Sequence, residues 1–318
     1  MNTIEKLQNH YNEYLTENNF KGSPANLYDP MNYIMSLGGK RVRPLLSIIG
    51  NQLAGGDIQN GIYVGHVMEV FHNFSLVHDD IMDKADTRRG NPTVHKKWDE
   101  PTAILSGDNM LVKAYELLIN YKGPNKDAIL KTFTNTAAEV CEGQQNDMDF
   151  EQRVDVDIES YLHMIQNKTA VLLGCSIKCG ALSANCSPEV SDELYNFAIN
   201  MGMAFQLMDD YLDTFGNSDN TGKIKGGDIL QGKKTWLFLN SQHIDEQKHQ
   251  ELFSFENGAN KVDLIISHWQ EIQLDKKCIQ LIESYNLKAH SNLAKIEHSG
   301  FNTEILINLL NYLSERQS

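Results

Sequence analysis

The chain carries the acidic pattern DDxxD twice, and each copy ends a long apolar stretch with helical spacing. Residues 79–83 read DDIMD after GIYVGHVMEVFHNFSLVH, and residues 209–213 read DDYLD after NFAINMGMAFQLM. Helical residues four apart share a face, so each copy places two carboxylates side by side with no lysine between them. Like charges repel at this spacing. The pattern therefore predicts that a cation bridges each pair.

The kind of cation follows from the ligand atoms. Carboxylate oxygens select Mg²⁺ or Mn²⁺ rather than zinc, and magnesium usually completes its shell with water and substrate phosphate. The two pairs, Asp79 with Asp83 and Asp209 with Asp213, therefore predict a phosphorylated ligand between them. The alternative is a pair of solvated acidic helix ends. Two copies, each following an apolar stripe, favour the metal site.

Helical spacing of apolar residues dominates the rest of the chain. Proline is scarce, at seven residues, and strand-like alternation is nearly absent. Helices are predicted over 44–54, 61–83, 107–121, 127–147, 161–184 and 192–215. The breaks between them are too short to be domain linkers. We therefore expect residues 1–318 to form one all-α domain, a helical bundle in which the two acidic helices converge on one site.

Charge and apolar length argue against two kinds of partner. The 318 residues carry a formal net charge of −14, which disfavours nucleic acid because phosphate backbones select basic surfaces. The first residues lack the basic and apolar regions of a secretory signal. Lys178 interrupts the longest apolar stretch, AVLLGCSIKCGAL, well short of a membrane span. We expect a cytoplasmic protein with no transmembrane segment.

The five cysteines do not follow the spacing of a metal site. Cys175 and Cys179 are four residues apart and share a helical face, but no second Cys or His pair stands nearby. Buried free thiols are therefore expected at these positions rather than zinc ligands.

Three basic segments could hold the phosphate groups. A guanidinium fork grips phosphate oxygens in pairs, and a helix N-terminus is itself an anion site. The candidates are Arg88 and Arg89 in DTRRGNP, Lys40, Arg41 and Arg43 in LGGKRVRP, and Lys223 and Lys233 in TGKIKGGDILQGKKT. The last segment is rich in glycine, as a closing lid is. One diphosphate held through metal and another held by side chains would mean two substrates.

The chain resembles a known family, the trans-isoprenyl diphosphate synthases, also called polyprenyl synthetases. The resemblance covers most of the chain and rests on motifs in the family's order: GGKRVRP, HNFSLVHDDIMDKADTRRG, GQQND, NKTA, FQLMDDYLD and GKIKGGDILQGKKT. It implies a homodimeric all-α fold with a deep central cavity and the two acidic motifs facing each other across its mouth. It also implies a prenyltransferase that condenses isopentenyl diphosphate with allylic diphosphates head to tail, using Mg²⁺ or in its place Mn²⁺.

The resemblance also implies residue roles. The Mg²⁺ ligands would be Asp79, Asp83 and Asp209, with Asp80, Asp210 and Asp213 in supporting places. The allylic diphosphate would be bound by Arg88, Lys168, Lys223 and Lys233, and isopentenyl diphosphate by Lys40, Arg43, His72 and Arg89. Without the resemblance, His72 would be taken as a core histidine. The dipoles of Thr169 and Gln206 would face the developing allylic cation, and Gln144 and Asp147 belong to the family's GQxxD segment.

Product length is expected to depend on Phe74 and Ser75, about one helical turn before Asp79. Among similar enzymes, aromatic residues at both positions look like those of synthases limited to a fifteen-carbon product. Small residues at both positions look like those of long-chain synthases. One aromatic and one small residue, without the two-residue insertion common in bacterial farnesyl synthases, is similar to enzymes that make geranylgeranyl diphosphate. Farnesyl diphosphate is the second choice. The alternative is that Phe74 is only a core aromatic.

Two other functions fit part of the pattern. A terpene cyclase shares the fold and the first acidic motif, but usually replaces the second and lacks the isopentenyl-binding basic set. A non-catalytic subunit of a heteromeric prenyl synthase tends to lose the acidic motifs. The intact DDYLD, with Lys40, Arg43 and Arg89, favours a synthase. One departure from the family pattern is Trp236 and Leu237, where a smaller residue and proline are common; we expect a change in local packing there.

Overall fold

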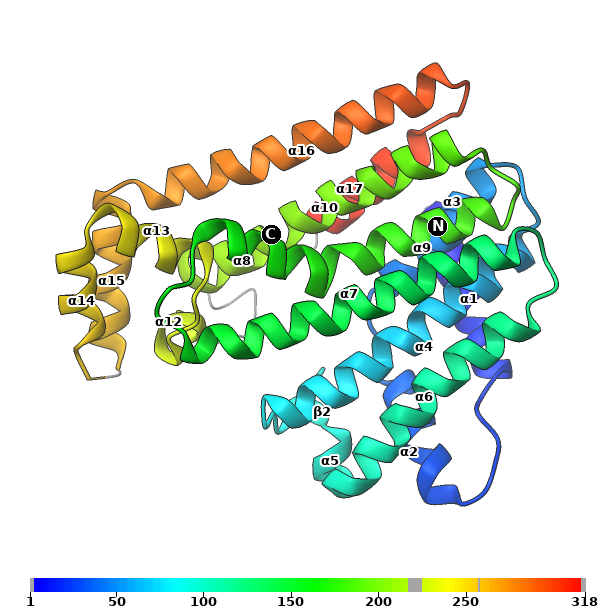
Figure 1. Cartoon of the computed structure of the whole chain (residues 1–318), viewed down its shortest axis with the longest axis horizontal. Helices are drawn as coiled ribbons and strands as arrows, with labels where there is room; N and C mark the ends of the chain where they lie inside the picture. Colours follow the sequence, from blue (N-terminus) through cyan, green and yellow to red (C-terminus); the bar gives the residue numbers. More distant parts are fainter. Residues whose placement is uncertain (1–2, 217–224, 257, 316–318) are drawn as a thin grey trace. The chain divides into compact units, whose positions relative to one another are not determined.

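The computed structural model describes residues 3–216, 225–256 and 258–315, and over these ranges the chain is helical apart from one small hairpin (Figure 1). The prediction of an all-α fold is confirmed. Within the same ranges, no helix combines the length and the apolar character that crossing a membrane requires.

The elements follow one another along the chain with short connections. They are α1 (Thr3–Glu17), α2 (Ala25–Ser36), α3 (Val42–Leu53), α4 (Ile58–Met82), β1 (Thr87–Arg88), β2 (Asn91–Pro92), α5 (Val94–Lys97), α6 (Glu100–Asn120), α7 (Lys126–Gln152), α8 (Ile158–Ile165), the π-helix η1 (Gln166–Ala170), α9 (Val171–Leu182), α10 (Pro188–Phe215), α12 (Gly227–Gln231), α13 (Trp236–Ile244), α14 (Glu246–Phe253), α15 (Ala259–Glu271), α16 (Leu274–His298) and α17 (Glu304–Glu315). The six predicted helices are all present. Their bounds differ from the predicted ones by up to seven residues, at the start of α6, and the predicted helix 161–184 is interrupted by η1.

The chain falls into two compact units. Unit 1 comprises Met1–Thr134, Cys175–Asp192 and Ser299–Asn308, and unit 2 comprises Asn135–Gly174, Glu193–His298 and Leu309–Ser318. The division falls inside α7, α9, α10 and α17. A single domain over 1–318 stays a prediction.

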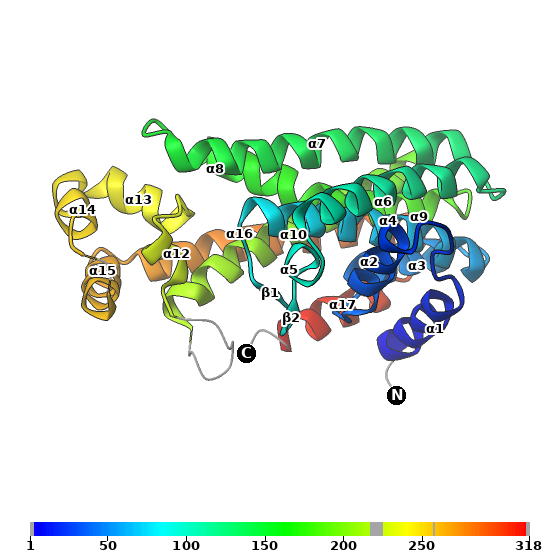
Figure 2. The ribbon, with the colours of Figure 1, turned by 90° about the horizontal axis from the view of Figure 1, so that it is seen from below.

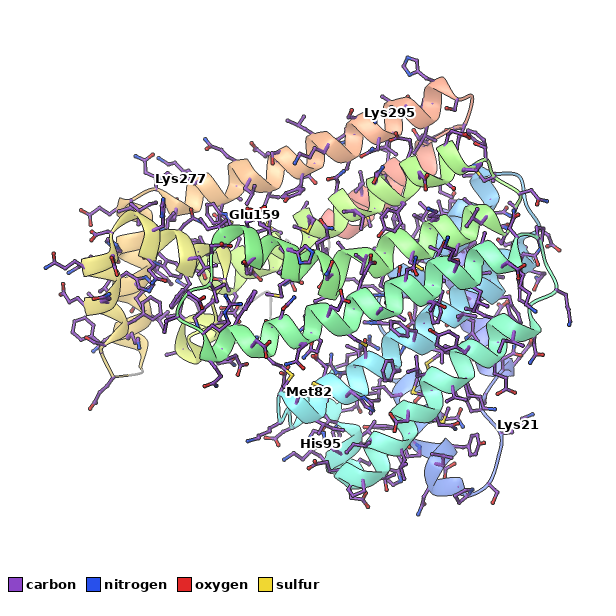
Figure 3. All side chains as sticks on the ribbon, viewed as in Figure 1. Lys21, Met82, His95, Glu159, Lys277 and Lys295 are labelled. Carbon is purple, nitrogen blue, oxygen red and sulfur yellow. The ribbon has the colours of Figure 1, made fainter. Side chains whose placement is uncertain are left out.

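Unit 1 is built around α4, the helix that ends in the first acidic pentapeptide. Helices α3 and α6 pack along α4, as both views of the ribbon show (Figures 1 and 2). Asp57 caps its start, because its carboxylate accepts a hydrogen bond from Gln59 N at 3.0 Å. Most side chains from Gly61 to Val77 are buried, whereas Met82, labelled in Figure 3, is exposed at the end of the helix. The apolar stretch thus anchors α4 and leaves its acidic end accessible.

The expected buried thiols also lie in unit 1. Cys175 and Cys179 share a face of α9, with their sulfur atoms 3.7 Å apart, and both are buried free thiols. The Cys175 thiol also lies 3.8 Å from Met68 Sδ on α4. These cysteines therefore contribute to helix packing.

Unit 2 has a hydrophobic core of its own. Helix α13 packs against α8 and α16, and α14 lies beside α15 (Figure 1). Trp236 and Leu237, the departure from the family pattern, are buried in this core. The start of α8 is fixed by Asp157, whose carboxylate accepts from Ser160 N at 2.7 Å. Glu159, labelled in Figure 3, marks this helix, which also carries the buried Tyr161.

Candidate active site

In unit 1 the first acidic pentapeptide lies across the end of α4. Asp83 N donates to Asp79 O at 2.8 Å, so the two residues are one helical turn apart, as predicted. Asp79 is partly exposed and Asp83 is exposed, whereas Asp80 is 1% exposed. Asp83 therefore faces outward, Asp79 is partly open to solvent with its Oδ1 buried, and Asp80 faces the protein.

Asp80 is held by Arg88 of the hairpin. Arg88 Nε lies 2.9 Å from each oxygen of Asp80, and Arg88 Nη2 lies 2.7 Å from Oδ1. The same Nη2 is 3.8 Å from Asp79 Oδ2. Burial raises the pKa of Asp80, and the bonds from Arg88 oppose that rise. Asp80 is thus committed to Arg88, and the guanidinium is anchored beside the outward-facing carboxylates.

The tight hairpin presents Arg89 at its tip. Arg88 pairs with Asn91 across a two-residue loop whose residues, Arg89 and Gly90, have φ values of 53° and 75°. Positive φ at both loop residues is the pattern of a type I′ turn, which suits the twist of paired strands. The Arg89 guanidinium then lies over the glycine turn before α3, where its Nη1 donates to Gly38 O.

That glycine turn requires glycine. Gly38 and Gly39 have φ values of 77° and 125°, and a Cβ added at Gly39 would lie 2.8 Å from Arg89 Cζ. Arg41, next along, is buried and bonds Glu69 Oε1 at 2.5 Å and Met35 O at 2.6 Å. Arg41 therefore fixes the segment that carries Lys40 and is not available to a ligand.

A cationic cluster forms beside this segment. Arg43 Nη1 lies 3.1 Å from His72 Nε2, and burial lowers the pKa of Arg43 to about 10. Burial, followed by the charges of Arg43 and Arg89, holds the pKa of His72 well below its usual value, so this histidine is neutral. Among the described residues, Arg43 Nε is buried without a hydrogen-bond partner. Unit 1 thus brings Arg43, His72 and Arg89 together, with Lys40 half-buried on the connecting turn.

In unit 2 the second acidic pentapeptide borders a cavity of about 200 Å³. Its lining includes eight residues that the sequence singled out, and they come from α7, α10, η1 and the segment before α13. These residues are Asp147, Lys168, Thr169, Gln206, Asp209, Asp210, Asp213 and Lys233. The structure therefore gathers carboxylates, lysines and two neutral dipoles around one space. Lys223 lies outside the described residues, and Gln144 is half-buried on α7 outside the cavity lining.

The π-helix η1 carries Lys168 and Thr169. Lys168 Nζ lies 2.6 Å from Asp147 Oδ2 on α7, which gives the GQxxD segment a contact with the cavity. Gly143, one turn earlier on the same face of α7, lets the two backbones approach: a Cβ there would lie 2.3 Å from Lys168 N. Such π turns are rare and occur frequently at functional sites.

Asp213 anchors the chain beyond the undescribed residues 217–224. Its Oδ2 accepts from Asp228 N at 3.0 Å, and its carbonyl oxygen accepts from Gly226 N at 2.8 Å. Lys233 Nζ lies 3.6 Å from Asp228 Oδ1. The last aspartate of the second pentapeptide therefore helps to position a lysine of the predicted lid.

Asp210 repeats the pattern of Asp80. It is 8% exposed, accepts a hydrogen bond from Tyr161 Oη at Oδ2, and accepts from Gln206 Nε2 at Oδ1, 3.1 Å away. Thr169 Oγ1 in turn donates to Gln206 Oε1 at 3.2 Å. Burial raises the pKa of Asp210 to about 7. In both pentapeptides the second aspartate is thus buried against the protein.

The two residues expected to set product length lie on α4. Phe74 is 8% exposed, and its ring centroid lies 5.4 Å from that of Phe71 and 4.9 Å from that of His78. Ser75 is half-buried, and its hydroxyl donates to His72 O at 2.8 Å. Phe74 thus belongs to an aromatic row below the first acidic pentapeptide, and its role in product length stays a prediction.

The donor set suits a hard divalent cation. Asp83 in unit 1 is exposed, and Asp79 in unit 1 and Asp209 and Asp213 in unit 2 are partly exposed. Within 3–216, 225–256 and 258–315, no cluster of three or more His, Cys, Asp or Glu side chains forms a complete metal cage. Magnesium typically binds through one or two carboxylates together with water and substrate phosphate. These residues therefore fit Mg²⁺ in a site that substrate completes.

Some cavity residues were not identified from the sequence. Asp228 and Lys234 lie within the glycine-rich segment, but nothing in its spacing distinguishes them. Tyr161 stands eight residues before Thr169, which in an α-helix is an offset of about 80°. The extra residue of the π turn reduces that offset, so α-helical periodicity does not place both on one face.

Comparison with known proteins places this geometry in a family. The model of the family described as polyprenyl synthetase matches residues 24–269. A short chain isoprenyl diphosphate synthase of Methanocaldococcus jannaschii is 37% identical over 274 residues, 85% of this chain and 81% of that protein. A geranylgeranyl diphosphate synthase of Saccharolobus solfataricus is 36% identical over 304 residues, 92% of this chain and 88% of that protein. A crystal structure of a geranylgeranyl pyrophosphate synthase matches with a TM-score of 0.91 at 40% identity, covering 100% of this chain and 99% of that one.

Proposed function

Because the chain belongs to the polyprenyl synthetase family and is a prenyltransferase, we propose that it condenses isopentenyl diphosphate with allylic diphosphates head to tail. The single observation that carries the proposal is the unit 2 cavity. There, Asp209 and Asp213 lie on the same lining as Lys168, Lys233 and two neutral dipoles. That lining suits a diphosphate joined to a carbon chain on which positive charge develops.

The residues divide between two substrates. In unit 2, Lys168 and Lys233 would hold the allylic diphosphate, and in unit 1 Arg88 would contribute from its anchored position beside Asp79. Isopentenyl diphosphate would be held by Lys40, Arg43, His72 and Arg89. A neutral His72 can donate one hydrogen bond to a phosphate oxygen, and the buried Arg43 Nε supplies another donor.

The cofactor proposed is Mg²⁺, with Mn²⁺ as a substitute, and its ligands would be Asp79, Asp83 and Asp209. When bound, it neutralises charge on the diphosphate and so makes it a better leaving group. Asp80 and Asp210 are not proposed as ligands, because protein donors occupy both oxygens of each. Their burial keeps the outward carboxylates in place.

The chain's own residues then control the carbon chemistry. The allylic C–O bond breaks, and its electron pair leaves with pyrophosphate, which Lys168 and Lys233 hold. Thr169 and Gln206 face the developing cation with oriented dipoles. The alkene of isopentenyl diphosphate attacks the cationic carbon, and a proton is lost to the departing pyrophosphate. The apolar side chains of the lining, Phe150, Met164 and Ile165, would help to keep water from the cation.

The proposed product is geranylgeranyl diphosphate, with farnesyl diphosphate second. Two observations support this length. Phe74 is a bulky residue and Ser75 a small one before the first acidic pentapeptide, and two of the relatives described above are named geranylgeranyl synthases. A terpene cyclase or a non-catalytic subunit has less support, since both acidic pentapeptides are intact.

A homodimer is also proposed. Helix α6 carries Leu105, Val112 and Ile119 at intervals of seven residues, and these side chains are 60%, 59% and 57% exposed. Heptad spacing of apolar residues is typical of a helix that packs on another helix. The proposed occupant is a second copy of this chain. Val112→Glu should shift the mass measured by light scattering from dimer to monomer, and a wild-type monomer would refute the proposal.

A cytoplasmic location stays a prediction.

The proposed reaction can be tested by measuring the release of pyrophosphate while each of three components is left out in turn. Release should require isopentenyl diphosphate, an allylic diphosphate and a divalent cation together. Omission of any one should reduce the rate to background. Full release with the allylic substrate alone would indicate a cyclase instead. No release with all three present would indicate a non-catalytic subunit.

A further inference from the structure

Tyr161 lines the unit 2 cavity but has no role in the chemistry described above. Its side chain is 2% exposed, and its ring belongs to the hydrophobic core that α8 shares with α13. Its hydroxyl donates a hydrogen bond to Asp210 Oδ2. A packed ring has little freedom to move, so this hydroxyl is held at a fixed position against the carboxylate.

The Asp210 carboxylate transmits that constraint. Its Oδ2 accepts from the tyrosine hydroxyl, and its other oxygen, Oδ1, also accepts a hydrogen bond. The donor of that second bond is the amide nitrogen of Gln206, 3.1 Å from Asp210 Oδ1. With its nitrogen directed at Asp210, the Gln206 amide must direct its carbonyl oxygen the other way.

The carbonyl oxygen of Gln206 meets Thr169 on the π-helix. Thr169 Oγ1 donates to Gln206 Oε1 at 3.2 Å, which fixes the hydroxyl proton on that side. The hydroxyl's lone pairs are then free to turn toward the cavity that both residues line. Four side chains from α8, α10 and η1 thus form one directional hydrogen-bond chain.

We propose that Tyr161 is a positioning residue, whose hydroxyl orients the dipoles of Gln206 and Thr169 toward the allylic carbon by way of Asp210. The inference rests on the proposed function. It names a specific part for Asp210, the second aspartate of the second pentapeptide: this residue orients dipoles, while its neighbour Asp209 faces the ligand. It also explains why a tyrosine hydroxyl is buried in an otherwise apolar helix face.

The test is Tyr161→Phe, which keeps the ring and removes only the hydroxyl. Loss of one oriented donor in an active site costs about 100-fold or more, and an indirect constraint should cost less; we expect kcat to fall about tenfold. The KM for the allylic diphosphate should stay within about twofold, because its contacts with Lys168 and Lys233 do not pass through Tyr161. Tyr285→Phe on α16, outside the cavity lining, is the matched control and should retain kcat.

A double-mutant cycle separates positioning from general support. In a Gln206→Met background the series of hydrogen bonds from Tyr161 to Thr169 is already interrupted, so Tyr161→Phe should change kcat by less than about twofold. The same tenfold loss in both backgrounds would overturn the inference, as would wild-type kcat in Tyr161→Phe. If Tyr161→Phe does not fold, Asp210→Asn breaks the next link, and the same cycle with Gln206→Met decides. If the wild type condenses the two diphosphates but the variants show none of these changes in kcat, this inference alone is refuted. If the wild type does not condense them, the proposed function is refuted.

Discussion

Arg88 holds Asp80 by both carboxylate oxygens, with Nε 2.9 Å from each. Asp210, at the same place in the second pentapeptide, is held by Tyr161 and Gln206. Each acidic pentapeptide therefore has one buried aspartate committed to the protein and two that are exposed or partly exposed. The chemistry should therefore depend on the exposed aspartates of each pentapeptide rather than on the buried one.

Asp79→Ala and Asp209→Ala should each lower kcat by orders of magnitude, because ligands of a catalytic metal act mainly on the transition state. Far-UV circular dichroism should stay that of wild type, since both side chains are partly exposed. Asp263→Ala, at an exposed position of α15, is the control and should keep full activity. Activity within about threefold of wild type would mean a loss below ~0.7 kcal/mol and would refute the metal role.

Gly143→Ala should impair both stability and turnover. The added Cβ would lie 2.3 Å from Lys168 N and 2.7 Å from Asn167 C, which are backbone atoms that cannot rotate away. Forcing them apart should cost about 1–3 kcal/mol in the free energy of unfolding. Because it also displaces Lys168 and Thr169, kcat should fall at least about tenfold.

Gly50→Ala is the matched control for Gly143→Ala. A Cβ at Gly50 would lie 2.3 Å from Ile177 O, so the backbone conflict is similar, but neither residue is proposed for the site. Chemical denaturation should show comparable destabilisation of the two variants, with kcat lowered only in Gly143→Ala. Equal kcat in both folded variants would contradict a positioning role for the π turn.

Much of this arrangement could be predicted from the sequence. The spacing of apolar residues predicts the helices, and the paired aspartates stand one turn apart because Asp83, which caps the end of α4, still makes the helical hydrogen bond to Asp79 O. The separate functions of neighbouring aspartates could not be predicted, since the pattern DDxxD does not indicate which carboxylate finds a buried partner. That depends on Arg88, fixed by a hairpin, and on Tyr161, brought into register by a π turn. Neither feature has a helical period, so neither is visible to a periodicity argument.

Phe74→Ala should lengthen the product by at least one five-carbon unit, and Ser75→Phe should shorten it. Both follow if the chain grows along α4, because the first change removes a ring about one turn from Asp79 and the second adds one. Ser75→Ala changes little volume and is the control. Chromatography of the products would measure the shift. An active Phe74→Ala enzyme with the wild-type product would show that Phe74 is only part of the row with Phe71 and His78.

Acid should destabilise the protein partly through His66. Its ring is buried among Tyr14 and Phe20, and burial lowers its pKa to about 4. The unfolded chain takes up this proton near pH 6.5, about 2.5 pH units earlier, so the free energy of unfolding should fall as the pH falls from about 6.5 towards 4. Above that window both states are neutral at His66, and its contribution should not change with pH.

Urea denaturation at several pH values would test this linkage. His66→Phe keeps an aromatic ring and removes the titration, so its stability should fall less steeply than that of wild type between about pH 6.5 and 4. His290→Gln, at an exposed position of α16, should follow wild type. Parallel curves for His66→Phe and wild type would contradict the assignment.

The most direct test of the whole account is mass spectrometry of the products formed from isopentenyl diphosphate with dimethylallyl, geranyl and farnesyl diphosphate in turn, with and without Mg²⁺. The account predicts that all three primers are extended to the twenty-carbon geranylgeranyl diphosphate in the presence of Mg²⁺, and that a chelator abolishes extension. Unextended primers in the presence of Mg²⁺, or full extension in excess chelator, would contradict it.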